Sequence, residues 1–133
     1  MQRIVIYGEH PDETKYFQPE LKKLILSRQE WPLIEDYTGD LPGFLERVRC
    51  NPFLIMLAVV NGPKAPEIIQ RIKENNPEAR LIWYSDHDYA LYSFGMRVTS
   101  FGLLPVTPGA LCLSMDACGL YHQNAEAPAP DIV

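Results

Sequence analysis

The sequence has no lysine or arginine after Arg97, so residues 98–133 contain no basic side chain. The whole chain carries a formal charge of −5 at pH 7. Protein surfaces that bind nucleic acids need lysine and arginine to neutralise the phosphates. We therefore predict that this domain has no direct contact with nucleic acid, and that any effect on DNA requires another chain or a further domain.

The sequence also lacks long apolar runs and paired cysteines. No apolar stretch approaches the roughly 18 residues that are needed to cross a bilayer, which predicts no membrane span. The N-terminal stretch passes directly into a strand-like pattern without the apolar core of a signal peptide. The three cysteines, Cys50, Cys112 and Cys118, show no CxxC spacing. An odd number of unpaired thiols fits a reducing compartment, so we expect a cytoplasmic protein.

The remaining composition is that of one globular domain, with 133 residues of which 47% are hydrophobic. Apolar strand-like segments alternate along the chain with segments of helical periodicity. The predicted strands are 3–7, 32–39, 53–62, 79–86 and 98–106, and the predicted helices are 12–29, 41–51, 63–77, 88–97 and 107–123. This alternation predicts a doubly wound parallel sheet in a domain of residues 1–123, followed by a Pro/Ala-rich tail or linker at 124–133.

Several residues predict where helices begin. Pro19 lies inside the helical pattern of 12–29, which predicts a kink there or a helix that begins at it. Asp88 is a plausible N-cap of the helix at 88–97. Thr107 and Pro108 open the last helix.

An ordered set of residues near the fourth and fifth strands carries a resemblance. The set is Ser85, Tyr89-Ala90, Phe94, Phe101 and Leu104-Pro105. With the order and spacing of the elements, it resembles a response-regulator receiver domain over residues 2 to 121, and is most similar to receivers of LytTR-type regulators. The resemblance implies a three-layer, flavodoxin-like fold whose five-stranded parallel sheet has the order 2-1-3-4-5.

Receiver chemistry uses five groups, and the resemblance places each of them in this sequence. Two carboxylates that hold Mg²⁺ correspond to Gly8 and Glu9, and the phosphate-accepting aspartate corresponds to Ala58. The hydroxyl after the fourth strand is kept in Ser85, and the lysine before the last proline becomes Leu104. A carboxylate attacks phosphorus only when cations neutralise the developing charge. The nucleophile, one metal ligand and the cation are therefore all missing.

These losses do not depend on the alignment, because residues 53–60 contain no acid in any register. A single carboxylate is also a poor Mg²⁺ site. We therefore predict a pseudo-receiver that is not an enzyme and uses no cofactor or metal. Its degenerate phosphoacceptor pocket consists of Gly8, Glu9, Ala58, Ser85, Leu104 and Pro105. Receivers typically have a cis peptide before this proline, and we expect the Ser85 hydroxyl to bond locally to the backbone.

A metal site is an alternative at the same strand ends. It would use Glu9, His10, Asp86 and His87. The favoured interpretation is a solvated loop whose acids cap the following helix.

The last helix predicts an interface. Leu111, Met115 and Cys118 share one face, whereas Leu113 and Leu120 point the opposite way. Receivers commonly dimerise and signal through this region, so the resemblance and the pattern both favour a homodimer through residues 88–123. The predicted interface residues are Tyr89, Phe94, Phe101, Leu113 and Leu120.

The sequence thus predicts a non-phosphorylatable signalling module of a two-component or transcription-regulator system. It would act by contact with itself, a signalling partner or an output domain. The tail would be a linker to a LytTR-type output domain or the end of a stand-alone protein. One alternative is a domain that binds a small molecule in the strand-end crevice, though not a phosphate, because the segment 8–13 offers one glycine and three acids. The third alternative is a working receiver whose phosphate acceptor lies elsewhere in the chain.

Overall fold

The structure is a computed structural model that describes residues 3–27, 33–50, 53 and 55–119. Its sheet is parallel, with the strand order β2-β1-β3-β4-β5. The elements are β1 (Arg3–Gly8), α1 (Pro11–Thr14), α2 (Phe17–Ser27), β2 (Leu33–Thr38), α3 (Leu41–Cys50), β3 (Ile55–Val59), α4 (Ala65–Asn75), β4 (Arg80–Ser85), α5 (Ala90–Gly95), β5 (Ser100–Leu103) and α6 (Pro108–Ala117). The predicted fold class and strand order are confirmed.

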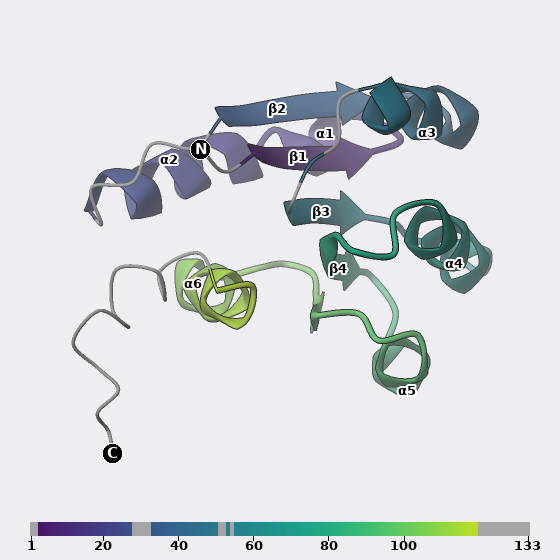
Figure 1. The fold of residues 1–133 in the computed structure, drawn as a ribbon. Helices are drawn as coiled ribbons and strands as arrows, with labels where there is room; N and C mark the ends of the chain where they lie inside the picture. Colours follow the sequence, from purple (N-terminus) through teal and green to yellow (C-terminus); the bar gives the residue numbers. More distant parts are fainter. Residues whose placement is uncertain (1–2, 28–32, 51–52, 54, 120–133) are drawn as a thin grey trace, which may run out of the picture.

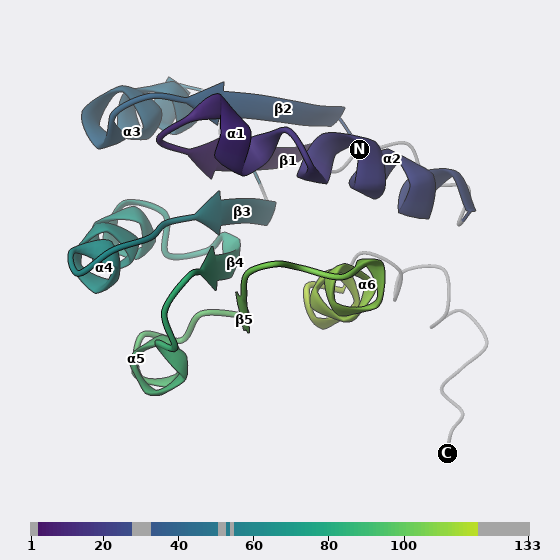
Figure 2. The same cartoon turned by 180° about the vertical axis from the view of Figure 1, so that it is seen from behind.

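Helices cover both faces of the sheet. Helices α2 and α6 lie on one side, and α3, α4 and α5 lie on the other (Figure 1). The view from behind shows the same division (Figure 2). Among the described residues, no helix has both the length and the apolar character needed to cross a bilayer.

Strand β3 is buried on both faces, as its apolar sequence predicts. Its side chains alternate, so that Ile55, Leu57 and Val59 join the core cluster beneath α2 and α6. Met56 and Ala58 join the second cluster, beneath α3 and α4. Each fully buried aliphatic side chain contributes roughly 1.5–3 kcal/mol, so this strand ties both layers to the sheet.

The segment 12–29 forms two helices instead of the predicted single one. Helix α1 ends at Thr14 and α2 begins at Phe17, which places Pro19 in the first turn of α2. The first turn of a helix has no backbone acceptor for its N–H groups, so a proline there removes no hydrogen bond. The prediction that a helix begins close to Pro19 is therefore right, and the continuous helix before it is wrong.

The predicted start of the last helix is confirmed, because Thr107 is the N-cap of α6 and its hydroxyl accepts a hydrogen bond from the Ala110 amide at 3.1 Å. The prediction for α5 is off by one residue. Its N-cap is Tyr89 and not Asp88, although the Asp88 carboxylate accepts a hydrogen bond from the Ala90 amide at 3.0 Å. Helix α6 ends at Ala117 and not at residue 123. Leu120 and the tail at 124–133 lie outside the described residues.

The two faces of α6 differ as predicted. Leu111, Met115 and Cys118 are fully buried, whereas Leu113 is 71% exposed. Ser114 lies on the buried side, where its hydroxyl accepts a hydrogen bond from the Tyr84 hydroxyl at 2.6 Å. That bond satisfies two buried polar groups and fixes α6 against the sheet.

The three thiols should differ strongly in reactivity. Burial raises the pKa of Cys118 to about 12, whereas Cys50 is exposed. Because the thiolate is the reactive species, we expect an aromatic disulfide reagent at pH 8 to label Cys50 quickly and Cys118 only as fast as the protein unfolds. The measurement compares a variant that keeps only Cys118 with one that keeps only Cys50, in buffer and in denaturant. Equal native rates would contradict the packing of α6.

Candidate functional site

The carboxyl ends of the parallel strands meet at one edge of the sheet, which is where doubly wound folds place their sites. Gly8 and Ser85 are buried there, at the ends of β1 and β4. Glu9 is exposed in the loop after β1, and Leu104 and Pro105 follow β5. The peptide bond between Leu104 and Pro105 is cis, as expected.

Ala58 does not line the space at this edge. It pairs with Tyr7 in the register of β1 and β3, and its side chain lies in the cluster beneath α3 and α4. The next residue, Val59, pairs with Gly8 and reaches the open side. The strand therefore presents valine at the edge, and no residue from Ile55 to Val60 carries an acid.

Gly8 occupies a position that has no room for a side chain. A Cβ atom there would lie 2.7 Å from Thr14 Cγ2 and 3.2 Å from Glu13 Oε1. Thr14 is 2% exposed and has little space to move. A side chain at position 8 would therefore require Thr14 or Glu13 to move.

Glu13 is the site residue that sequence reasoning missed. Its Oε1 atom accepts hydrogen bonds from the Glu9 and His10 amides at 2.9 and 3.2 Å. Its Oε2 atom accepts one from Asn61 Nδ2 at 3.2 Å. In a capping box, a glutamate at the third helical position accepts a hydrogen bond from the amide of the residue that precedes the helix. His10 and Glu13 have this spacing, so the sequence gave a usable signal for the bond to the His10 amide.

Asn61 connects three loops at this edge. Besides donating to Glu13, it accepts a hydrogen bond from the Asp86 amide through Oδ1 at 2.8 Å. Asp86 in turn accepts a weak bond from the Gly62 amide at 3.4 Å. The loops after β1, β3 and β4 are therefore joined by direct side-chain hydrogen bonds. We call Glu13, Asn61 and Asp86 the loop bridge.

Ser85 and His87 both form hydrogen bonds within the loop after β4. His87 Nδ1 lies 2.8 Å from Asp86 Oδ1, and this hydrogen bond holds the pKa of the Asp86 carboxyl below its usual value. The Ser85 hydroxyl accepts from the His87 amide and donates to Asp86, both at 3.4 Å, so it bonds locally as predicted. Over the part of the chain that the structure describes, no three His, Cys, Asp or Glu side chains gather as metal ligands. The metal alternative built on Glu9 and His10 thus finds no support.

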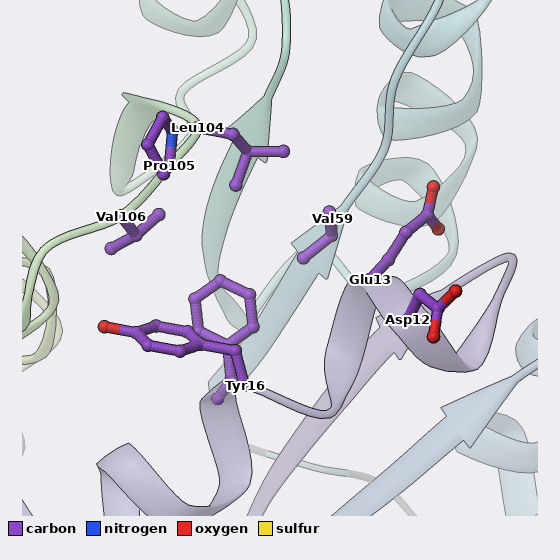
Figure 3. A pocket seen from close by; sticks show the side chains of 8 residues that line it. Asp12, Glu13, Tyr16, Val59, Leu104, Pro105 and Val106 are labelled. Atoms are coloured by element: carbon purple, nitrogen blue, oxygen red, sulfur yellow. The ribbon is translucent and has the colours of Figure 1, made fainter.

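A cleft of about 340 Å³ opens beside the loop bridge. It lies between the α1–α2 segment and the chain that follows β5 (Figure 3). Its lining residues are Asp12, Glu13, Tyr16, Phe17, Val59, Leu104, Pro105 and Val106. Leu104 and Pro105 are thus brought to the cleft as predicted, whereas Gly8, Glu9, Ala58 and Ser85 are not among its lining residues.

A second feature is a set of exposed apolar side chains near the β5 edge of the sheet. The large apolar side chains that are exposed on α5, β5 and α6 are Leu91, Tyr92, Phe94, Leu103 and Leu113, which are 88%, 60%, 86%, 50% and 71% exposed. We call these five residues the α5–α6 face. They come from β5, which is the edge strand of the sheet, and from the two helices that contact it.

Only part of the predicted interface set belongs to this face. Phe94 and Leu113 are exposed as predicted. Tyr89 instead stacks on buried Trp83 with ring centroids 5.2 Å apart, and its hydroxyl donates to the Gly62 carbonyl at 2.7 Å. Phe101 packs edge-on against the same Trp83 at 5.1 Å. The structure therefore gives Tyr89 and Phe101 intramolecular roles, because the large indole ring provides both with a partner.

Comparisons with known proteins support this geometry at the level of the fold. No family model matches the sequence, and no curated protein matches it. Among solved structures, the REC domain of AraT, a response regulator from Geobacillus stearothermophilus, superposes with a TM-score of 0.68 at 13% identity, covering 92% of this chain and 97% of that one. A response regulator receiver domain protein from Clostridium thermocellum gives 0.66 at 15% identity, covering 96% and 99%.

This chain has the receiver fold. A two-component response regulator of the LuxR family from Aurantimonas sp. SI85-9A1 also superposes on it, with a TM-score of 0.64 at 20% identity and 86% and 82% coverage. The LytTR type stays a prediction.

The tight packing at Gly8 predicts an unusual sensitivity to a single methyl group. We expect Gly8→Ala to lower the free energy of unfolding by about 1–3 kcal/mol, because the new Cβ would overlap buried Thr14. Gly109→Ala, where a Cβ atom meets nothing within 4 Å, is the matched control and should change stability by less than about 0.5 kcal/mol. Chemical denaturation measures both, and equal effects would contradict the close contact.

The loop bridge predicts a specific role for Asn61. Asn61→Ala removes hydrogen bonds to Glu13 and to the Asp86 amide, so we expect a loss of about 1–2 kcal/mol of stability and faster amide exchange at Asp86. Asn75→Ala is the control, because that side chain donates to the Arg71 carbonyl within its own helix. Unchanged exchange at Asp86 in Asn61→Ala would show that the bridge does not hold the loops.

Proposed function

We propose that this protein is a receiver-like signalling module that is not phosphorylated and that acts through protein–protein contact, including self-association through the α5–α6 face. The observation that carries the proposal is the pairing of a receiver fold with a strand end that presents Val59 instead of an acid. The fold is that of signalling domains, and the chemistry that normally drives them has no nucleophile here.

The electrostatics of the strand-end edge support the absence of phosphotransfer. The side chain before the cis proline is Leu104, so the expected cation is missing. The two acids that line the cleft, Asp12 and Glu13, would repel an incoming phosphoryl donor. Glu13 is also engaged with two backbone amides and with Asn61. Neither the attack on phosphorus nor the stabilisation of its charge has the groups it requires.

The α5–α6 face supports contact with protein. Its side chains come from three consecutive elements and include Phe94 and Leu113 at 86% and 71% exposure. Burying such side chains removes apolar surface from water, which is the main driving force for association. We propose a homodimer through this face, with a LytTR-type output domain or another signalling protein as the further partner. The predicted contribution of Leu120 lies outside the described residues.

Acetyl phosphate tests the absence of phosphotransfer. The full chain, incubated with acetyl phosphate and Mg²⁺, should show no added phosphoryl group by intact mass, because residues 53–60 contain no acid. A receiver domain with its aspartate, treated in parallel, provides the positive control. An intact mass that is unchanged for this chain and increased by one phosphoryl group for the control supports the proposal. A phosphorylated Asp or Glu in this chain would overturn it.

Light scattering tests self-association. We expect the wild type to be a dimer at tens of micromolar, and Phe94→Asp and Leu113→Asp to be monomers, because each places a charge within the α5–α6 face. Leu33→Asp is the matched control, since Leu33 is 41% exposed on β2 at the opposite edge of the sheet. A wild-type monomer, or equal dissociation by the control, would contradict the interface.

A further inference from the structure

We propose that the cleft at the strand-end edge binds a small organic cation, with an apolar body against Val59 and Leu104 and an ammonium group at Glu13. This goes beyond the proposed function, because it assigns a ligand to the strand-end cleft, to which the proposed function gives no role. It does not depend on the α5–α6 face.

The shape of the cleft fits a small ligand. Its volume of about 340 Å³ lies at the lower end of the range that small-molecule sites occupy. The residues that close it come from three separated parts of the chain: the α1–α2 segment, the end of β3 and the segment after β5 (Figure 3). Two of these parts are held in place, since Val59 belongs to the central strand and Glu13 to the loop bridge.

The lining selects an apolar body. Phe17, Val59 and Val106 are almost fully buried and form part of its inner surface. Leu104 and Pro105 stand where a receiver would carry a lysine and its proline. Tyr16 is 36% exposed and meets Phe17 edge-on, with ring centroids 5.1 Å apart. An aromatic or aliphatic group in this space would displace water from apolar walls, which favours binding.

The charges of the lining select a cation over an anion. Its acidic residues are Asp12 and Glu13, and no lysine, arginine or histidine among the described residues lines the cleft. Asp12 is paired with Lys15 at 3.3 Å in an exposed ion pair, which offsets part of its charge. An anionic ligand would meet a carboxylate and an apolar wall, without a cation to receive it.

Glu13 keeps its charge available although its position is fixed. It accepts hydrogen bonds from the amides of Glu9 and His10 and from the side chain of Asn61, and all three donors are neutral. A carboxylate has about four acceptor sites, so these bonds leave room for a further donor. Because the side chain is already oriented, an ammonium group can bind without the entropic cost of ordering it. An oriented carboxylate beside an apolar cavity is the combination that recognises an amphiphilic amine.

The probe is 2-phenylethylamine, titrated into the full chain and followed by amide chemical shifts. We expect saturable shifts at the amides of residues 12–17, 59, 104 and 106. The matched anion 3-phenylpropionate should leave these residues unshifted, and n-propylamine, which lacks the ring, should bind at least tenfold more weakly. Saturable binding of the anion at the same residues, or no saturable shifts with the amine, would overturn the proposal.

Two variants test the groups that carry the argument. Glu13→Gln keeps the size of the side chain and should weaken the amine on the order of tenfold, whereas Glu78→Gln, which precedes β4 at the opposite edge, should not. Leu104→Lys should abolish binding, because it places a cation at the cleft, and Leu104→Met should preserve it. If Glu13→Gln fails to fold, the Leu104 pair still decides. Equal binding by Leu104→Lys and Leu104→Met would overturn the proposal, and none of these outcomes bears on the dimer.

Discussion

The burial of β3 on both faces is the constraint on which the rest of the structure depends. An all-apolar strand in the middle of a parallel sheet must be covered from both sides, and parallel neighbours must be connected by crossover helices. Those crossovers bring the ends of β1, β3, β4 and β5 to one edge. The same requirement puts a valine at that edge, since the alternation that buries Leu57 and Val59 on one side buries Ala58 on the other.

At this edge, direct hydrogen bonds hold the loops together. Glu13, Asn61 and Asp86 join the loops after β1, β3 and β4. Because these groups are covalently attached to the chain, the arrangement of the loops follows from the sequence itself. A ligand can shift that arrangement only by binding one conformation of the loops more tightly than another.

The elements whose evidence is local could be predicted from the sequence, and the contacts between distant segments could not. The apolar strands and the faces of α6 follow from periodicity, so Leu111 and Leu113 were placed correctly. The break between α1 and α2 was missed because the apolar pattern runs on through Tyr16 and Phe17. Glu13 and Asn61 are 48 residues apart, and nothing in either segment indicates that they meet. The hydrogen bond from the Tyr89 hydroxyl to the Gly62 carbonyl spans 27 residues and could not be predicted either.

The contact between Gly8 and Thr14 has a consequence for the substitutions that the fold accepts at position 8. A larger residue there would need the space that the Thr14 methyl group and the Glu13 side chain now fill. A carboxylate at position 8 would therefore require compensating changes at positions 13 and 14, and the first change alone would destabilise the fold. These three positions are coupled, so they tolerate change as a set and not one at a time.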